Sequence, residues 1–238
     1  MNSKLLTKQS VDTHYNEHLV RRHDYPNENI VRLVGTFFQN QDFFEGRVEV
    51  DRSSSSKGLV LDYGCADGNN SRFLLERGFD VCAIDITKES IEKTNQNLNN
   101  FDKSRWQTDV LSMGDDKLPY KENQFDYIVS NQVVYFLASR ERIDNLLKEF
   151  KRVLKPNGRM IISMISRFNT YCFNGTPKGN DIYTYKTSYG EIDIYVTKNE
   201  SQLHDVFSLF EISEIGYWDN NYDGMCGHHY VVKAFNKK

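Results

Sequence analysis

Residues 58 to 85 read GLVLDYGCADGNNSRFLLERGFDVCAID, and this stretch decides the fold. An apolar run over 59–61 ends at Asp62 and is followed by a loop of small residues, a pattern typical of a buried strand and a tight turn. Apolar residues at 73–75 then predict a helix, and a second apolar strand runs to Asp85. Strand, helix and strand in this order form half of a nucleotide-binding sheet, whose ligand lies at the carboxyl ends of the strands.

The loop after the first strand separates two classes of ligand. Dinucleotide-binding proteins carry GxGxxG, in which glycines let the backbone approach a pyrophosphate. Read from Gly64, this loop is GCADGN, so Ala66 and Asn69 occupy the second and third glycine positions. Asp67 also places a carboxylate where the helix N-terminus would otherwise attract the pyrophosphate. The loop therefore fits a nicotinamide cofactor poorly.

The same residues resemble motif I of the class I S-adenosylmethionine-dependent methyltransferases, which is an acid followed by x-Gly-x-Gly/Ala-x-Gly. Here the motif is DYGCADG, from Asp62 to Gly68. The resemblance continues at VCAIDIT around Asp85, at the pair 109–110, and at LKPNGRMIISMI over 154–165. It implies an α/β fold with a Rossmann-like, doubly wound, seven-stranded sheet, a reversed last hairpin, N-terminal helices and a small cap after strand five.

The resemblance also implies roles for the residues at the strand ends. Asp62 would help to hold the loop and the ammonium end of the ligand, and Asp85 has two acceptor oxygens suited to the paired hydroxyls of a ribose. Asp109 and the Val110 backbone would recognise the amino edge of adenine. The alternative is that Asp62 and Asp85 only cap loops. The residues expected to bind S-adenosyl-L-methionine are Asp62, Gly64, Cys65, Ala66, Gly68, Asp85, Ile86, Asp109, Val110 and Asn131.

A polar serine run divides the chain of 238 residues. DRSSSSKG covers 51–58 and is typical of a linker, so we expect an N-terminal helical lid and linker over 1–57 and the methyltransferase core over 58–238. A helix after Pro26 should pack its apolar stripe against the sheet. That stripe is Ile30, Leu33, Val34, Phe37 and Phe38.

The remaining elements continue the alternation of helices and strands. Thr87 is a predicted helix N-cap, and short strands are expected at 105–107, 125–130 and 160–165. A helix before the last of these carries Ile143, Leu146, Leu147, Phe150 and Leu154 on one face and ends at PNG. FEISEIGYW over 210–218 and HHYVVKAF over 228–235 supply the reversed hairpin.

Residues 167–199 resemble the family least and are rich in aromatic side chains. Within them, DIYTYKTSYGEIDIYV predicts two strands about a turn near Gly190. An insertion after the fifth strand lies at the rim of the ligand crevice, so we interpret it as a substrate cap. The alternative is an added hairpin that serves dimerisation or edge protection.

The resemblance implies in-line transfer of a methyl group from the sulfonium of S-adenosyl-L-methionine to an acceptor. A general base is needed only where that acceptor is a hydroxyl. The candidate bases are His18, Tyr15 and Tyr135. Tyr15 and His18 would belong to the lid, with a solvated helix as the alternative. Tyr135 and Phe136 would line the space beside the methyl group, with a place in the core as the alternative.

Composition restricts the partners. A net charge of -3 and the sequence SNQVVYF after the fourth strand, in place of the N/D-P-P-Y/F block, both disfavour a nucleic-acid acceptor. An aromatic cap suits a ring, so we expect a monomer or homodimer that O-methylates a small molecule such as a saccharide or another bacterial metabolite. The alternatives are a non-catalytic S-adenosylmethionine-binding regulator or partner protein, and a nicotinamide-dependent oxidoreductase.

Location and metal content follow from what the sequence lacks. No apolar run approaches the roughly 18 to 20 residues of a membrane span, and the first residues lack an apolar signal core, which predicts a cytoplasmic protein without a membrane partner. His14 and His18 stand four apart, but no carboxylate or cysteine set completes a metal site, so no metal is expected. The four cysteines show no CxxC spacing and are expected to be reduced.

Overall fold

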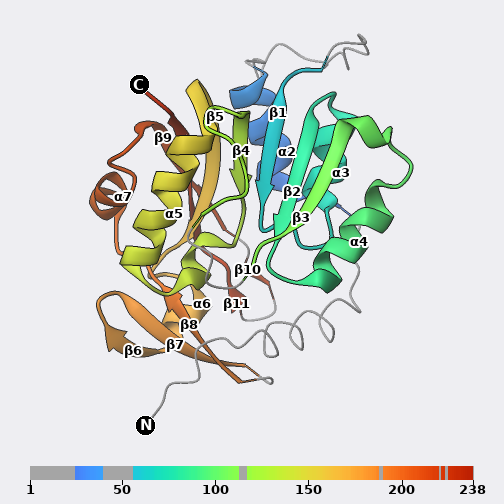
Figure 1. The fold of residues 1–238 in the computed structure, drawn as a ribbon. Coiled ribbons are helices and arrows are strands. Elements are labelled where there is room, and N and C mark those ends of the chain that lie inside the picture. The colour runs from blue at the N-terminus through green and yellow to red at the C-terminus, as the bar shows by residue number, and fades with distance from the viewer. Residues whose placement is uncertain are drawn as a thin grey trace.

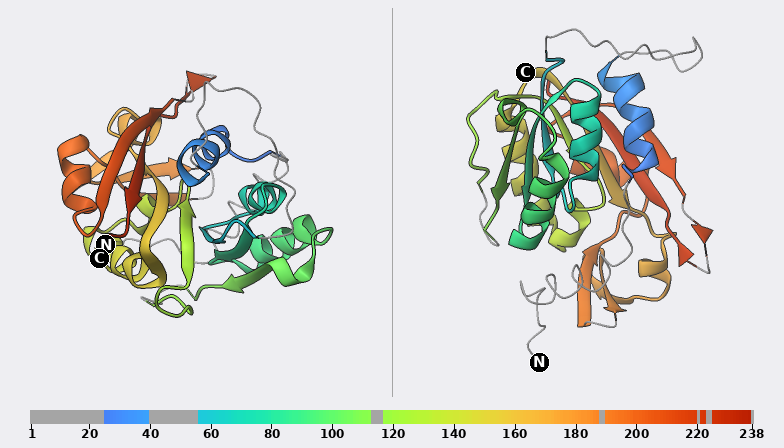
Figure 2. Two further views of the ribbon diagram at one scale, coloured as in Figure 1. Left: turned by 90° about the horizontal axis from the view of Figure 1, so that it is seen from above. Right: turned by 90° about the vertical axis from the view of Figure 1, so that its right-hand side faces the viewer.

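A seven-stranded sheet runs through the centre of the molecule, with helices on both of its faces (Figures 1 and 2). The computed structural model describes residues 25–39, 56–112, 117–187, 190–219, 221–222 and 225–237. The strands, in spatial order, are β3 (Trp106–Val110), β2 (Asp80–Asp85), β1 (Leu59–Tyr63), β4 (Phe125–Ser130), β5 (Leu154–Ile165), β12 (His229–Phe235) and β9 (Glu211–Trp218).

The first five strands along the chain are parallel, and the last pair is reversed. β12 runs antiparallel to β5 on one side and to β9 on the other. This topology confirms the predicted Rossmann-like sheet with a reversed last hairpin. Apolar side chains of the strands point toward both faces of the sheet, as expected for a sheet that is covered by helices on two sides.

Each face of the sheet has its own apolar core. On one face lie α2 (Glu28–Leu33), α3 (Asn69–Glu76) and α4 (Lys88–Leu98), and on the other lie α5 (Arg140–Val153) and α7 (Glu200–Val206). The predicted N-cap is confirmed, because the Thr87 hydroxyl accepts from Ser90 N at 3.1 Å. His204 is exposed on α7, next to buried Leu203.

The predicted N-terminal stripe packs on the first of these faces. α2 continues as the π-helix η1 (Val34–Phe38), and four of the five stripe residues are buried: Ile30, Val34, Phe37 and Phe38. The Phe38 ring lies 4.4 Å from the Tyr127 ring of β4 and 6.3 Å from the ring of Phe79. Other parts of the predicted lid and linker lie outside the described residues, including His14, Tyr15 and His18.

Two strand boundaries differ from the sequence prediction. β3 reaches Val110, so Asp109 is part of the strand and does not follow it. β5 begins at Leu154, which was assigned to the helix, because α5 ends at Val153 and Leu154 is extended and paired with Phe125. The residues after Leu154 form an irregularity before pairing resumes at Arg159. Proline is accommodated there because it has no N–H to leave unpaired.

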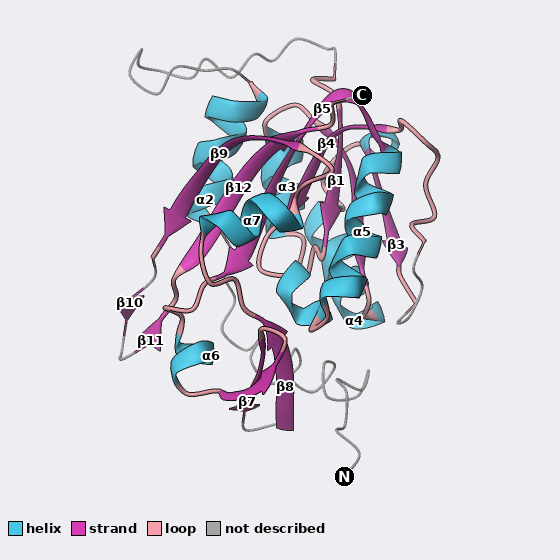
Figure 3. Ribbon diagram, turned by 90° about the vertical axis from the view of Figure 1, so that its left-hand side faces the viewer, coloured by secondary structure: helices cyan, strands magenta, loops and turns pink. Residues whose placement is uncertain are grey.

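The cap is a small sheet at the carboxyl edge of the main one (Figure 3). The two predicted strands are β7 (Ile182–Thr187) and β8 (Gly190–Tyr195), which pair antiparallel. The sequence analysis missed β6 (Thr176–Gly179) and α6 (Thr170–Phe173), which complete this unit, and also the short pair β10 (Asn221–Tyr222) and β11 (Met225–Cys226). An isolated bridge between Ser166 and Thr197 joins the two ends of the cap at its base.

Two further expectations can be compared with the structure. All four cysteines are free. Of the helices in the described ranges, none has the length and apolar character needed to cross a membrane.

We predict that Phe38→Ala lowers the free energy of unfolding by about 3 to 5 kcal/mol, since it removes a buried ring from between two others. Thr36→Ala is the matched control: it lies on the same turn of η1, and its hydroxyl bonds only the Arg32 carbonyl on an exposed surface, so about 0.5 kcal/mol or less is expected. Denaturant unfolding measures both. A loss below about 1 kcal/mol for Phe38→Ala would show that α2 is not part of the core.

Candidate functional site

Polar side chains gather where the parallel strands end. Asp62 is the penultimate residue of β1, Asp85 ends β2, Val110 ends β3 and Ser130 ends β4. The strands are in register, with Asp62 opposite Ala83 and Asp85 opposite Val110. All of these ends therefore lie at one edge of the sheet, the edge on which the cap sits (Figure 1).

The loop over 64–68 is tied to the neighbouring strand and helix by its backbone. Gly64 N and Cys65 N both donate to the Ile84 carbonyl of β2, at 2.8 and 3.1 Å. The Thr94 hydroxyl of α4 donates to the Ala66 carbonyl at 2.8 Å. These bonds pair polar backbone groups of the loop and fix its path past the carboxyl end of β2.

Two glycines make that path possible. Gly64 has φ +75°, and a Cβ there would lie 2.3 Å from Val133 Cγ2. Gly68 has φ +78°, and a Cβ there would lie 2.8 Å from Thr94 Cγ2. Ala66 also adopts a left-handed conformation, at φ 49°. The loop thus places bare backbone at the start of α3, where no side chain caps the helix at Gly68.

Asp62 is a buried carboxylate next to this loop. Its side chain is 1% exposed, and the Ser71 hydroxyl of α3 donates to its Oδ2 at 2.5 Å. Burial, opposed by this hydrogen bond, raises the pKa of Asp62 to about 6. A positively charged group placed beside Asp62 would favour the ionised form, because it offsets the loss of water.

Asp85 caps the loop, as the alternative interpretation expected. Its Oδ2 accepts from Ala66 N at 3.0 Å and its Oδ1 from Thr87 N at 3.1 Å. Burial raises the pKa of this carboxyl as well. Hydrogen bonds from the backbones of Ala66, Thr87 and Ile86 and from the Thr87 side chain oppose this rise. The structure therefore shows the loop-capping role of Asp85.

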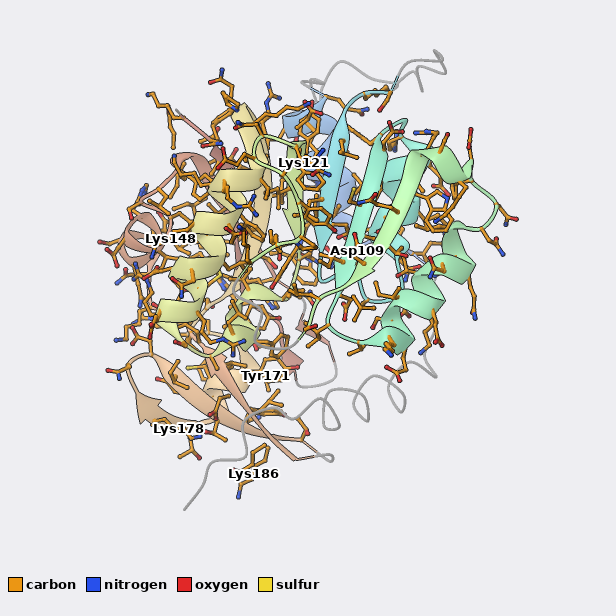
Figure 4. The ribbon with its side chains drawn as sticks, in the orientation of Figure 1. Asp109, Lys121, Lys148, Tyr171, Lys178 and Lys186 are labelled. Atoms are coloured by element: carbon orange, nitrogen blue, oxygen red, sulfur yellow. The ribbon has the colours of Figure 1, made fainter. Side chains whose placement is uncertain are left out.

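The end of β3 presents one acid and one exposed apolar residue. Asp109 is half-buried, and its Oδ2 accepts from the Tyr120 hydroxyl at 3.0 Å. Val110, the last residue of β3, is 42% exposed at this edge. Figure 4 shows Asp109 on the sheet, away from the cap residues Lys178 and Lys186.

Ile86 and Asn131 complete the predicted set of binding residues. Ile86 is partly buried and packs against the core on the α5 face. Asn131 is half-buried and follows β4 directly. The next residue, Gln132, has φ 60°, and its N–H donates to Ser163 Oγ at 2.6 Å, which fixes the chain after β4.

Tyr135 is the one predicted base within the described residues; His18 and Tyr15 lie outside them. Tyr135 is 2% exposed, on η3 (Val134–Leu137), and packs with Ile194 of the cap. Its hydroxyl lies 3.5 Å from His229 Nε2, while His229 Nδ1 donates to the Gly227 carbonyl at 2.6 Å. Burial lowers the pKa of His229 to about 4, so the imidazole is neutral near pH 7 with Nε2 as acceptor.

The sequence analysis assigned no role to several residues that support this site. His229 was left without a role because strand alternation allows one of His228 and His229 to face inward but does not say which. Parity gave no signal either, because Val231 and Val232 are both apolar and both buried, on opposite faces of the sheet. Ser71 and Tyr120 gave no local signal, since their partners Asp62 and Asp109 lie 9 and 11 residues earlier. In the described part of the chain, no three His, Cys, Asp or Glu side chains gather to hold a metal ion.

Comparison with known proteins agrees with this geometry. Residues 61–162, which run from within β1 to within β5, match the family described as "Methyltransferase domain". The demethylmenaquinone methyltransferase of Tropheryma whipplei is 31% identical over 107 residues, 45% of this chain and 41% of that protein. The probable S-adenosyl-L-methionine-dependent methyltransferase TehB of Haemophilus influenzae is 28% identical over 191 residues, 72% of this chain and 62% of that protein. The chain therefore spans less than two thirds of the length of either relative.

A solved structure shares the whole fold. It is the 1,6-didemethyltoxoflavin-N1-methyltransferase of Burkholderia thailandensis with bound 1,6-didemethyltoxoflavin and S-adenosylhomocysteine. The two structures superpose with a TM-score of 0.63 at 16% sequence identity, over 100% of this chain and 94% of that one.

We predict that Asp62 makes the folded state less stable as the pH rises. Its pKa is higher in the folded state, about 6, than its ordinary value of 3.8, so between these values the folded state binds more protons and stability falls with rising pH. Over pH 4 to 7 the free energy of unfolding of the wild type should fall by roughly 3 kcal/mol relative to that of Asp62→Asn. Urea unfolding at several pH values measures the difference; a constant difference would contradict a buried, ionising Asp62.

Proposed function

We propose that this chain, whose residues 61–162 match the methyltransferase domain family, is a class I S-adenosylmethionine-dependent methyltransferase that transfers a methyl group from S-adenosyl-L-methionine to a small-molecule acceptor. When bound, this cofactor supplies an activated methyl group on a sulfonium. The protein then contributes mainly alignment and exclusion of water, which can lower a barrier by about 7 to 11 kcal/mol.

The observation that carries the proposal is the pair of buried acids on either side of the glycine loop. Asp62 is almost fully buried and is hydrogen-bonded to a serine hydroxyl, so an ammonium group beside it would provide the missing positive charge. Asp85 ends β2 with two carboxylate oxygens, which we propose accept from two neighbouring hydroxyls of a ribose. A pyrophosphate would bring negative charge to both acids, so a dinucleotide fits the same edge badly.

The remaining predicted contacts extend from these two acids. We propose that the backbone of Gly64, Cys65, Ala66 and Gly68 contacts the methionyl part of the cofactor. A Cβ at either glycine would clash with neighbouring side chains, so the loop can follow this path only with glycine at both positions. Ile86 and Asn131 would lie along the nucleoside, and Asp109 with the Val110 backbone would meet the edge of the adenine. In this proposal the three acids accept from the ammonium, the ribose diol and the adenine amino group, in the order in which the cofactor carries these groups.

We propose a hydroxyl acceptor, such as that of a saccharide. Two features support this: the aromatic character of the cap, and the position of Tyr135 on η3, where it packs against the cap. Tyr135 is the described residue that we propose faces the acceptor hydroxyl, and its own hydroxyl lies 3.5 Å from His229 Nε2. Ile194 and Val196 pack on Tyr135, so the cap would move when the acceptor enters.

The first test is calorimetry with two cofactors, followed by turnover. We expect saturable binding of S-adenosylhomocysteine and no binding of NAD, and release of S-adenosylhomocysteine from S-adenosylmethionine in the presence of fractionated cell-extract metabolites. Saturable NAD binding without S-adenosylhomocysteine binding would reject the proposal. Tight cofactor binding without turnover on any fraction would favour a non-catalytic binding protein.

Asp85→Ala should weaken S-adenosylhomocysteine binding by about 10- to 100-fold, since two charge-assisted hydrogen bonds to the ribose are lost. It should also lower the free energy of unfolding by about 1 to 3 kcal/mol, because Ala66 N and Thr87 N lose their buried acceptor. Asp80→Ala is the matched control: it is an acid at the opposite end of β2, paired with Arg105 at 3.0 Å, and should leave the affinity unchanged. Affinity for Asp85→Ala within twofold of wild type would show that Asp85 only caps the loop.

A further inference from the structure

The carboxylate of Asp109 is held by a tyrosine from another segment of the chain. Tyr120 lies on the connection between β3 and β4, and its hydroxyl donates to Asp109 Oδ2 at 3.0 Å. The Gln107 side-chain amide donates to the same oxygen at 3.5 Å. Within the described residues, no hydrogen bond ends on Asp109 Oδ1. The carboxylate is therefore fixed through one oxygen, and the other is left as an acceptor.

Packing of its ring and hydrogen bonds to its backbone hold Tyr120 in place. Its side chain is buried, at 7% exposure, and its ring packs edge-on against Phe125 at 4.9 Å. Arg152 of α5 donates to the carbonyls of Tyr120 and Leu118, at 2.7 and 3.0 Å. Glu149 accepts from Leu118 N at 2.8 Å and pairs with Arg152 at 2.6 Å. Together, Glu149 and Arg152 hold residues 118–120 against α5, and this fixes the position of the Tyr120 hydroxyl beside Asp109.

The direction of the hydrogen bond is also fixed. Burial and the negative charge of Asp109 raise the pKa of Tyr120 well above its ordinary value. The phenol therefore keeps its proton over the pH range in which the protein is studied, and it donates to the carboxylate. Asp109 remains an acceptor at Oδ1 for whatever donor lies at the end of β3.

A carboxylate held in this way can distinguish adenine from hypoxanthine by the group at position 6 of the purine. Adenine carries an amino group there, which donates to a carboxylate oxygen, whereas hypoxanthine carries a carbonyl, which the same oxygen repels. The side-chain torsion that sets the plane of an aspartate carboxylate is soft, so an unsupported carboxylate could turn away from either base. A support that holds the plane makes the distinction sharper.

We propose that Tyr120 determines the base selectivity of the cofactor site, by orienting the Asp109 carboxylate toward the 6-amino group of adenine. This inference rests on the proposed function, since it takes the adenosyl group to lie at the end of β3. Tyr120 is a positioning residue: it acts on the cofactor through Asp109 and does not itself touch it.

The test compares two nucleosides by calorimetry, S-adenosylhomocysteine and S-inosylhomocysteine, on the full chain. Wild type should prefer the adenosyl compound by at least about tenfold, and Tyr120→Phe should reduce this preference by about three- to tenfold, in line with the loss of one hydrogen bond. Asp109→Asn should abolish the preference, because an amide can donate to the carbonyl of hypoxanthine. Tyr127→Phe is the matched control. It removes a tyrosine hydroxyl that bonds the Phe38 carbonyl instead, and should leave the preference unchanged.

The outcomes separate the inference from the proposal beneath it. A Tyr120→Phe variant that keeps the wild-type preference, or that loses affinity for both compounds equally, overturns the inference and leaves the proposed function standing. A wild-type chain that binds neither compound overturns the proposed function and this inference with it. A preference that falls in Tyr120→Phe and Asp109→Asn but not in Tyr127→Phe supports the positioning role.

Discussion

The hydrogen bond from Ala66 N to the Asp85 carboxylate is the contact on which the candidate site depends. It ties the tip of the glycine loop to the end of β2, and the second oxygen of the same carboxylate accepts from Thr87 N at the entry to α4. One buried side chain therefore sets the relative positions of a loop, a strand and a helix. Because this carboxylate lies at the edge where the parallel strands end, the group that shapes the site is also one that we propose binds the ligand.

This arrangement works against the stability of the chain that carries it. Asp62 and Asp85 are both buried, and burial raises the pKa of each. The charge of Asp85 also raises the pKa of Asp62, so the two acids disfavour each other's ionisation. Hydrogen bonds from Ser71 and from backbone N–H groups offset part of this cost, and a cationic ligand would offset more. The folded protein should therefore be less stable with the site empty than with a cationic ligand bound, as expected for binding groups that are arranged before the ligand arrives.

Much of the fold was predictable because it follows from local patterns. The motif from Asp62 to Gly68 predicted β1, the loop and α3, and the apolar run over 125–130 matched β4 to the residue. β5 was less predictable, since Pro156 and Gly158 signal a break while the actual strand absorbs them as an irregularity. The supporting residues were hidden for a different reason. Tyr120 and Asp109, or Tyr135 and His229, come together only through the tertiary fold, and their spacing in the sequence carries no sign of it.

The place of β12 in the sheet has a consequence for how the protein is made. β9 is synthesised before β12, yet among the described residues its one neighbour in the sheet is β12, which lies between β9 and β5. Until His229–Phe235 have left the ribosome, β9 has nothing to pair with and β5 presents an open, apolar edge. A nascent chain halted in this interval would expose that edge to other chains, a known route to aggregation. The five parallel strands can pair before this point, but the antiparallel side of the sheet is completed only when the last strand has been made.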